Sequence, residues 1–145
     1  MVHGQAFFVV GHKNWGKSQT LKALTGAHQV RRFTVGTRTF WIRRMSNDDR
    51  ESEWLNLVRG LDPSSKPSVI LTMCPTTTAY NALRELSSRY ALFFWIIQQS
   101  YGDERVVSLE QEQSLRALGT TDVLTGRVEA GERAAAFRRF IEAHP

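Results

Sequence analysis

Two kinds of segment alternate along the chain. Short, mostly apolar runs are separated by longer segments whose apolar residues recur every three or four positions. The runs at residues 7–10, 68–73 and 91–97 predict strands, and the last has no polar alternation, which is typical of a strand buried on both faces of a parallel sheet. The spaced segments predict helices. These helices lie within residues 17–25, 46–61, 76–90, 108–119 and 129–143.

The segment VRRFTVGTRTFWIRRM, residues 30–45, is rich in β-branched and aromatic residues. Gly36-Thr37 interrupts it, so it predicts two strands, at about 31–35 and 38–45, joined by a tight hairpin turn. A last short strand is predicted at residues 121–125. Because strands and helices alternate, we expect one three-layer α/β domain over residues 1–145. Its sheet would be mainly parallel with one antiparallel edge strand.

The first predicted strand and helix enclose GHKNWGKS, residues 11–18, which has the Walker A pattern G-x-x-x-x-G-K-[ST]. Glycines let successive main-chain N–H groups wrap a phosphate, and the following helix adds the positive end of its dipole. Lys17 would be the catalytic charge clamp on the β- and γ-phosphates, and the Ser18 hydroxyl would bind Mg²⁺. The residues expected to bind the nucleotide are Gly11, His12, Lys13, Asn14, Trp15, Gly16, Lys17, Ser18 and Gln19.

The opening VVGHKNWGKSQTLKALTG, residues 9–26, resembles that of the translation-factor-related GTPases of ribosome assembly and tRNA modification. The matching positions are Gly11, Asn14, Gly16, Lys17, Ser18, Ala23, Leu24 and Gly26. The order of the predicted elements is also that of a Ras-like GTPase. The resemblance implies a P-loop NTPase fold with a Ras-like sheet, GTP as the ligand, and a monovalent cation such as K⁺ held by Asn14.

The switch region of these GTPases is altered here. Only residues 27–30 separate the first helix from the hairpin, too few for a loop that folds a threonine over the γ-phosphate. Thr34, Thr37 and Thr39 are available but are expected to be strand or turn residues.

The D-x-x-G motif is replaced by SNDD, residues 46–49. Asp48 or Asp49 would orient Mg²⁺ there. Alternatively, Asn47 and these aspartates would cap the next helix, whose dipole favours carboxylates. The other apolar runs end without an acidic residue, so a motor-type Walker B site is not predicted.

The guanine-reading motif N-K-x-D is absent, and QQSYGDE, residues 98–104, follows the run at 91–97. The amide of Gln98 or Gln99, or the Asp103 carboxylate, could read a base, or this segment could be an ordinary loop. Thr125 and Gly126 are expected near the base. The sequence therefore predicts GTP or ATP without choosing between them.

The formal net charge of +5 favours anionic partners. Five arginines crowd the hairpin, with aromatic residues between them, namely Arg31, Arg32, Arg38, Arg43 and Arg44. They could bind nucleic acid by phosphate pairing and stacking, or guard an edge strand against aggregation. Adjacent arginines within one strand would point to opposite faces.

The single cysteine, Cys74, excludes an internal disulfide and is expected to be a buried structural thiol without a nearby histidine. The amino-terminal segment lacks the pattern that predicts a signal peptide, and no apolar run reaches the roughly 20 residues that span a bilayer. We therefore expect a cytoplasmic protein with no membrane contact.

These observations predict Mg²⁺-dependent binding of a nucleoside triphosphate. Hydrolysis would be slow or stimulated by a protein partner, because no residue that positions water can be assigned. The chain would then be a nucleotide-dependent switch or an accessory subunit. The alternatives are a small ATP-dependent phosphotransferase and a nucleic-acid-binding module on a P-loop fold.

Overall fold

The computed structural model describes residues 4–12, 16–27, 30–98, 107–126 and 128–145. The strands are β1 (Gly4–Val10), β2 (Arg32–Val35), β3 (Arg38–Ile42), β4 (Ser68–Met73), β5 (Tyr90–Gln98) and β6 (Thr120–Thr125). The helices are α1 (Lys17–Thr25), α2 (Glu51–Arg59), α3 (Thr77–Leu86), α4 (Leu109–Leu118) and α5 (Ala130–Glu142). The predicted alternation of strands and helices is confirmed.

The strands form one sheet in the order β2-β3-β4-β1-β5-β6. All neighbours are parallel except β2, which is antiparallel to β3 at one edge. The expected mainly parallel sheet is thus confirmed, but the Ras-like strand order is wrong, because β4 lies between β1 and β3. Burial accounts for the three inner positions together, but not for the order of β1 and β4 within them. β1, β4 and β5 are almost wholly buried and take the three central positions, whereas β2 and β3 carry exposed residues.

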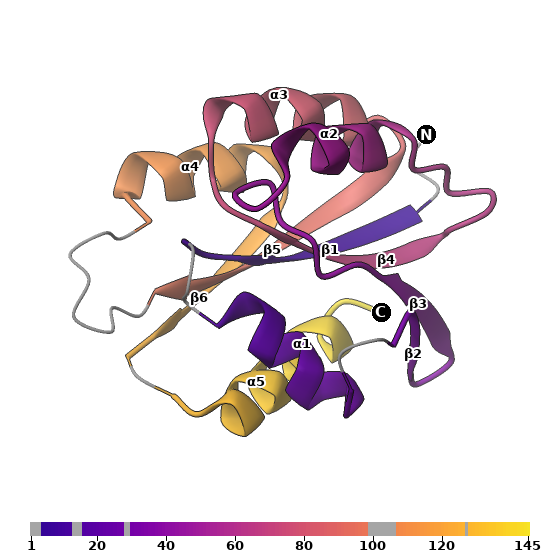
Figure 1. The fold of residues 1–145 in the computed structure, drawn as a ribbon, viewed down its shortest axis with the longest axis vertical. Helices are drawn as coiled ribbons and strands as arrows, with labels where there is room; N and C mark the ends of the chain where they lie inside the picture. The colour runs from indigo at the N-terminus through magenta and orange to yellow at the C-terminus, as the bar shows by residue number, and fades with distance from the viewer. Residues whose placement is uncertain (1–3, 13–15, 28–29, 99–106, 127) are drawn as a thin grey trace.

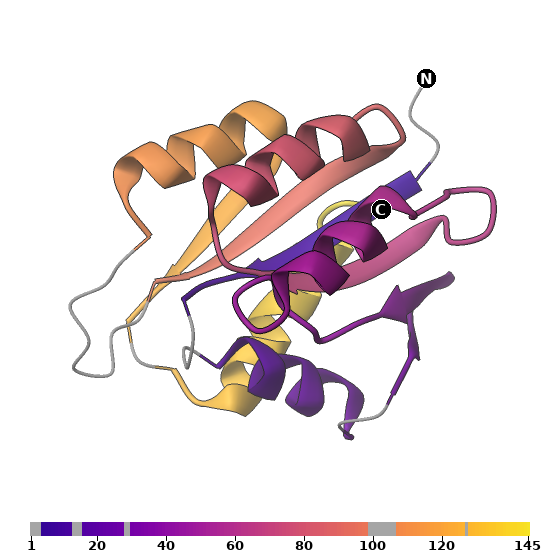
Figure 2. The same ribbon diagram turned by 45° about the horizontal axis from the view of Figure 1, so that its top comes forward.

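Helices cover both faces of the sheet. In Figure 1 and Figure 2, α2, α3 and α4 lie on one side, and α1 and α5 lie on the other. Successive side chains of β1 point to opposite faces of the sheet and pack against the two helix layers. Phe8 packs in the cluster that includes Trp54 and Leu115, and Phe7 packs with Leu21 and Phe137.

Two element ends differ from the predictions. β3 ends at Ile42 instead of residue 45, because the chain leaves the sheet after the bond from the Arg43 N–H to the Ile70 carbonyl (3.1 Å). α3 ends at Leu86, so Tyr90 belongs to β5 and not to a helix. Its buried hydroxyl donates to the Lys66 carbonyl at 2.6 Å.

The direction of the strands decides which loops meet. Every described strand except β2 runs in the same direction. The segments that follow these strands therefore lie together at the carboxyl end of the sheet. The hairpin turn at Gly36 and Thr37 lies at the opposite, amino-terminal end of these strands, because it precedes β3. Thr34 and Thr39 face each other across the hairpin, with hydroxyls 3.2 Å apart. Thr34, Thr37 and Thr39 are thus strand and turn residues, as expected, and lie away from the predicted phosphate loop at residues 11–18.

Candidate functional site

The loop between β1 and α1 is fixed at both of its described ends. The Gly11 N–H donates to the Met73 carbonyl at 3.0 Å, which continues the pairing of β1 with β4. Gly16 has a φ of 88°, and a Cβ there would lie 2.6 Å from Nη2 of Arg133. Glycine is required at this position both for its backbone conformation and for the close approach of Arg133.

Lys17 begins α1, yet its side chain is only 8% exposed. Its ammonium donates to the Gly11 carbonyl at 2.6 Å and lies 3.3 Å from Oδ2 of Asp48. The charge is therefore held over the phosphate loop, at the positive end of the α1 dipole. α1 has no acidic residue in its first turn and no side-chain cap at Gly16. Its first N–H groups can thus receive an anion.

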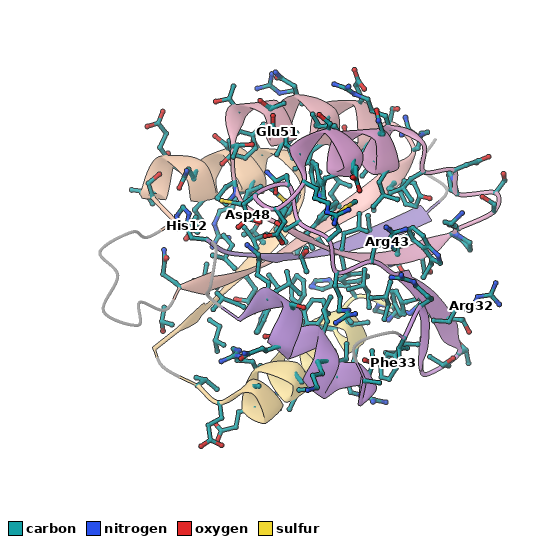
Figure 3. The ribbon with its side chains drawn as sticks, viewed as in Figure 1. His12, Arg32, Phe33, Arg43, Asp48 and Glu51 are labelled. Atoms are coloured by element: carbon teal, nitrogen blue, oxygen red, sulfur yellow. The ribbon has the colours of Figure 1, made fainter. Side chains whose placement is uncertain are left out.

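Asp48, labelled in Figure 3, lies in the segment between β3 and α2, and its Oδ2 is 3.3 Å from Nζ of Lys17. Its other oxygen, Oδ1, is buried and accepts no hydrogen bond within the described part of the chain. An unpaired buried carboxylate oxygen is costly, and a hard cation would satisfy it. Ser18, the other expected Mg²⁺ ligand, is exposed on α1, and Asp49 is exposed beside Asp48. The Mg²⁺ roles of Asp48, Asp49 and Ser18 stay predictions, and the unpaired oxygen of Asp48 is the observation that favours one of them.

Asn47 fixes the Asp48 segment to the end of β4. Its amide donates to the Cys74 carbonyl at 2.8 Å and accepts from the Cys74 N–H at 2.7 Å. The N-cap of α2 is Arg50, which makes no side-chain cap bond. The proposed capping role of residues 47–49 is therefore not what the structure has, since Asn47 binds Cys74 and Asp48 pairs with Lys17.

Cys74 has a histidine neighbour, which corrects the sequence expectation. Its Sγ lies 3.6 Å from Nδ1 of His12, the second residue of the phosphate loop. Cys74 is half-buried rather than fully buried. Within the described residues, no group of three or more His, Cys, Asp or Glu side chains could hold a metal ion. This pair therefore joins the end of β4 to the loop without forming a metal centre.

Arg133 of α5 was not identified from the sequence. It is 2% exposed, and its Nε donates to Oγ1 of Thr20 at 2.9 Å while Nη1 donates to the Val128 carbonyl at 2.5 Å. Thr20 in turn donates to the Gly16 carbonyl at 2.7 Å. Arg133 thereby ties the phosphate loop to the segment after β6. Its position on the face that carries Phe137 and Ile141 was the available signal, because a charge there is unusual.

The other predicted site residues, including those proposed to read the base, lie in several different parts of the chain. The side-chain amide of Gln98 donates to the Val107 carbonyl at 2.6 Å and accepts from the Val107 N–H at 2.9 Å, which joins the end of β5 to Val107. Thr125 ends β6, and Gly126 follows with a φ of 88°. Gln19 is exposed on α1. Several predicted site residues lie outside the described residues, namely Lys13, Asn14, Trp15, Gln99 and Asp103.

The five hairpin arginines do not form one surface. Arg38 bonds the Gln5 side chain and the carbonyls of His144 and Ile141, at 2.8, 2.8 and 2.9 Å. Arg32 projects outward from the edge of the sheet (Figure 3). Arg31, Arg43 and Arg44 line one cavity. Arg43 and Arg44 share it because β3 ends before them, so strand alternation does not separate them.

No protein-family model and no curated protein sequence matches this chain. Two solved structures resemble it in fold. One is an unliganded sugar kinase from Janibacter sp. HTCC2649, with 13% identity, a TM-score of 0.56, and coverage of 98% of this chain and 96% of that chain. The other is a de novo designed protein of P-loop NTPase fold, with 12% identity, a TM-score of 0.52, and coverage of 97% of both chains. No described helix is long and apolar enough to cross a membrane. The chain has a P-loop NTPase-like fold.

Proposed function

We propose that this chain binds a nucleoside triphosphate, GTP or ATP, together with Mg²⁺, through the loop at residues 11–18. The observation that supports this proposal most directly is the position of the Lys17 ammonium. It lies at the start of α1, 2.6 Å from the Gly11 carbonyl and 3.3 Å from Asp48. A buried cation in that place is suited to the β- and γ-phosphates.

Each residue has a separate task in this proposal. Lys17 exchanges its present oxygen partners for phosphate oxygens, and Gly16 with the first N–H groups of α1 donates to the same phosphates. Ser18 and Asp48 would hold Mg²⁺, which when bound neutralises charge on the triphosphate. Arg133 keeps Gly16 and Thr20 in place from beneath the loop.

We further propose that hydrolysis is slow unless a protein partner stimulates it, so that the chain acts as a switch or accessory subunit. The support is chemical. Asp48, the carboxylate that pairs with Lys17, is assigned to Mg²⁺ in this proposal, and no other described acidic side chain bonds Lys17. A partner could supply the group that positions water.

A phosphotransferase is the second candidate, and a specific observation favours it. A cavity lined by arginines adjoins the segment that carries Asp48 and Asp49. An acceptor with an anionic group could lie there. Separation of the reaction products would distinguish transfer to an acceptor from release of inorganic phosphate.

Thermal unfolding with ATP, GTP and their diphosphates, with and without Mg²⁺ and K⁺, tests the main proposal. Ligand at about 100 times its Kd stabilises the folded state by about 2.7 kcal/mol, which raises Tm by roughly 6–10 °C for a chain of this size. Lys17→Ala should abolish most of that shift. Lys22→Ala, an exposed lysine of the same helix, is the matched control and should keep it. No shift with any nucleotide would refute the proposal.

A further inference from the structure

A cavity of about 420 Å³ lies beside the β2–β3 edge of the sheet, and its lining is dominated by charge. Arg31, Arg43, Arg44 and Arg50 contribute to it, together with Asp49 and Glu53. Its volume is within the range of small-molecule sites. Four arginines and two acidic residues therefore line a space that a small molecule could fill.

The main chain that carries these arginines is fixed. The Ile42 N–H donates to the Arg31 carbonyl at 2.8 Å, which places the start of β2 beside the end of β3. The Thr72 hydroxyl donates to the Arg44 carbonyl at 2.9 Å. Arg43 lies over the Trp41 ring, 5.9 Å from its centroid. These contacts hold the main chain of Arg31 and Arg44 and the side chain of Arg43 before a ligand arrives, which lowers the cost of binding.

The carboxylates of the cavity do not balance its positive charge. Glu53 lies 3.4 Å from Arg50, but both side chains are mostly exposed, so this pair is weak. Asp49 is the one other acidic residue among the described residues of the lining, against three further arginines, Arg31, Arg43 and Arg44. Burial, and then the positive charge of Arg31, lower the pKa of Arg44. Two like charges thus repel each other in this cavity, and an anion between them would relieve that repulsion.

We propose that the arginine cavity, formed by Arg31, Arg43, Arg44 and Arg50, binds the phosphate group of a small phosphate monoester. The planar fork of arginine matches phosphate oxygens, and several forks around one cavity favour a doubly charged group. This site is separate from Lys17 and goes beyond the proposed nucleotide binding. In a phosphotransferase, the monoester would be the acceptor.

The test uses the full chain with Lys17→Ala, so that the phosphate loop does not contribute. Thermal unfolding is followed with glycerol phosphate and phenyl phosphate, and with glycerol as the uncharged control. Both phosphates should raise Tm by several degrees, and glycerol should not. Adding Arg31→Gln and Arg44→Gln should weaken the affinity at least about tenfold, because two charged donors are lost.

Arg32→Gln is the matched control, since Arg32 is exposed next to Arg31 and does not line the cavity. It should change the affinity by no more than about twofold. The proposal is overturned if neither phosphate shifts Tm, if the double glutamine variant keeps the shift, or if Arg32→Gln removes it equally. Binding of a single-stranded oligonucleotide without any binding of the monoesters would also overturn it. Because Lys17 is already removed, failure here is distinct from failure of nucleotide binding.

Discussion

At the scale of single residues, Lys17 and Asp48 form the pair on which the candidate site depends. Their contact joins the phosphate loop to the segment before α2, which lies 31 residues further along the chain. Side-chain exposures of 8% and 15% mean that water screens this pair only weakly. Removing one partner would leave the other charge poorly compensated, so each variant must be compared with its own ligand-free state.

We predict that Asp48→Asn weakens the Mg²⁺-dependent part of triphosphate affinity about tenfold, because a neutral amide is a poorer Mg²⁺ ligand than a carboxylate. Asp49→Asn, which removes the same charge at an exposed neighbouring position, should change it by no more than about twofold. Affinity measured over a range of Mg²⁺ concentrations tests this. Equal losses in the two variants would contradict the role given to Asp48.

Tyr90 gives a prediction for alkaline pH. Burial, and then the nearby charge of Asp62, raise the pKa of its hydroxyl to about 12, from a usual value of 10.0. The folded protein therefore holds this proton more tightly than the unfolded chain. The stabilisation is fully present below about pH 10 and is lost as pH rises from 10 to 12.

Tyr90→Phe removes that contribution together with the bond to the Lys66 carbonyl. At neutral pH the variant should be less stable than the wild type by about 1 kcal/mol. Urea denaturation should show this difference narrowing above pH 10. A difference that stays constant up to about pH 11.5 would contradict the assignment.

At the scale of elements, α5 supports the phosphate loop from beneath. Arg133 spans from α5 to Thr20 of α1 and to the Val128 carbonyl, and it packs against Gly16. α1 and α5 are thus connected by a buried polar contact as well as by the apolar packing of Leu21 and Phe137.

We predict that Arg133→Met lowers the free energy of unfolding by about 2–3 kcal/mol, because it leaves buried oxygen atoms without a donor. It should also weaken triphosphate binding, since Gly16 loses its support. Arg139→Met, at an exposed position of the same helix, should cost no more than about 0.5 kcal/mol. Chemical denaturation and a nucleotide titration measure both effects. If the two variants behave alike, Arg133 has no positioning role.

At the scale of the whole molecule, local sequence patterns predicted the helices and strands, but not which strands lie next to each other in the sheet. The apolar run at 91–97 forms β5 and the segment at 108–119 contains α4, as expected. The order of the parallel strands is a property of the assembled layers, because exchanging β1 and β4 would leave the same three buried strands together in the sheet. That is why the Ras-like order failed although the element types were right.

The same limit applies to the site. A contiguous pattern identified residues 11–18, because the loop, the lysine and the following helix are adjacent in the chain. The contacts of Lys17 with Asp48, of His12 with Cys74 and of Thr20 with Arg133 join distant segments. No local pattern encodes such contacts, since they arise from the strand order and the helix packing.

The central claim is that Lys17 makes the loop at residues 11–18 a triphosphate site. The most direct measurement is a calorimetric titration, with Mg²⁺ present, of the wild type, Lys17→Ala and Lys22→Ala with the triphosphate, the diphosphate and the unphosphorylated nucleoside. We predict that the affinity of the wild type increases with the number of phosphate groups on the ligand. The affinity for the triphosphate should fall by about 10- to 100-fold in Lys17→Ala and be unchanged in Lys22→Ala. Equal binding of the triphosphate by the wild type and Lys17→Ala would contradict the claim.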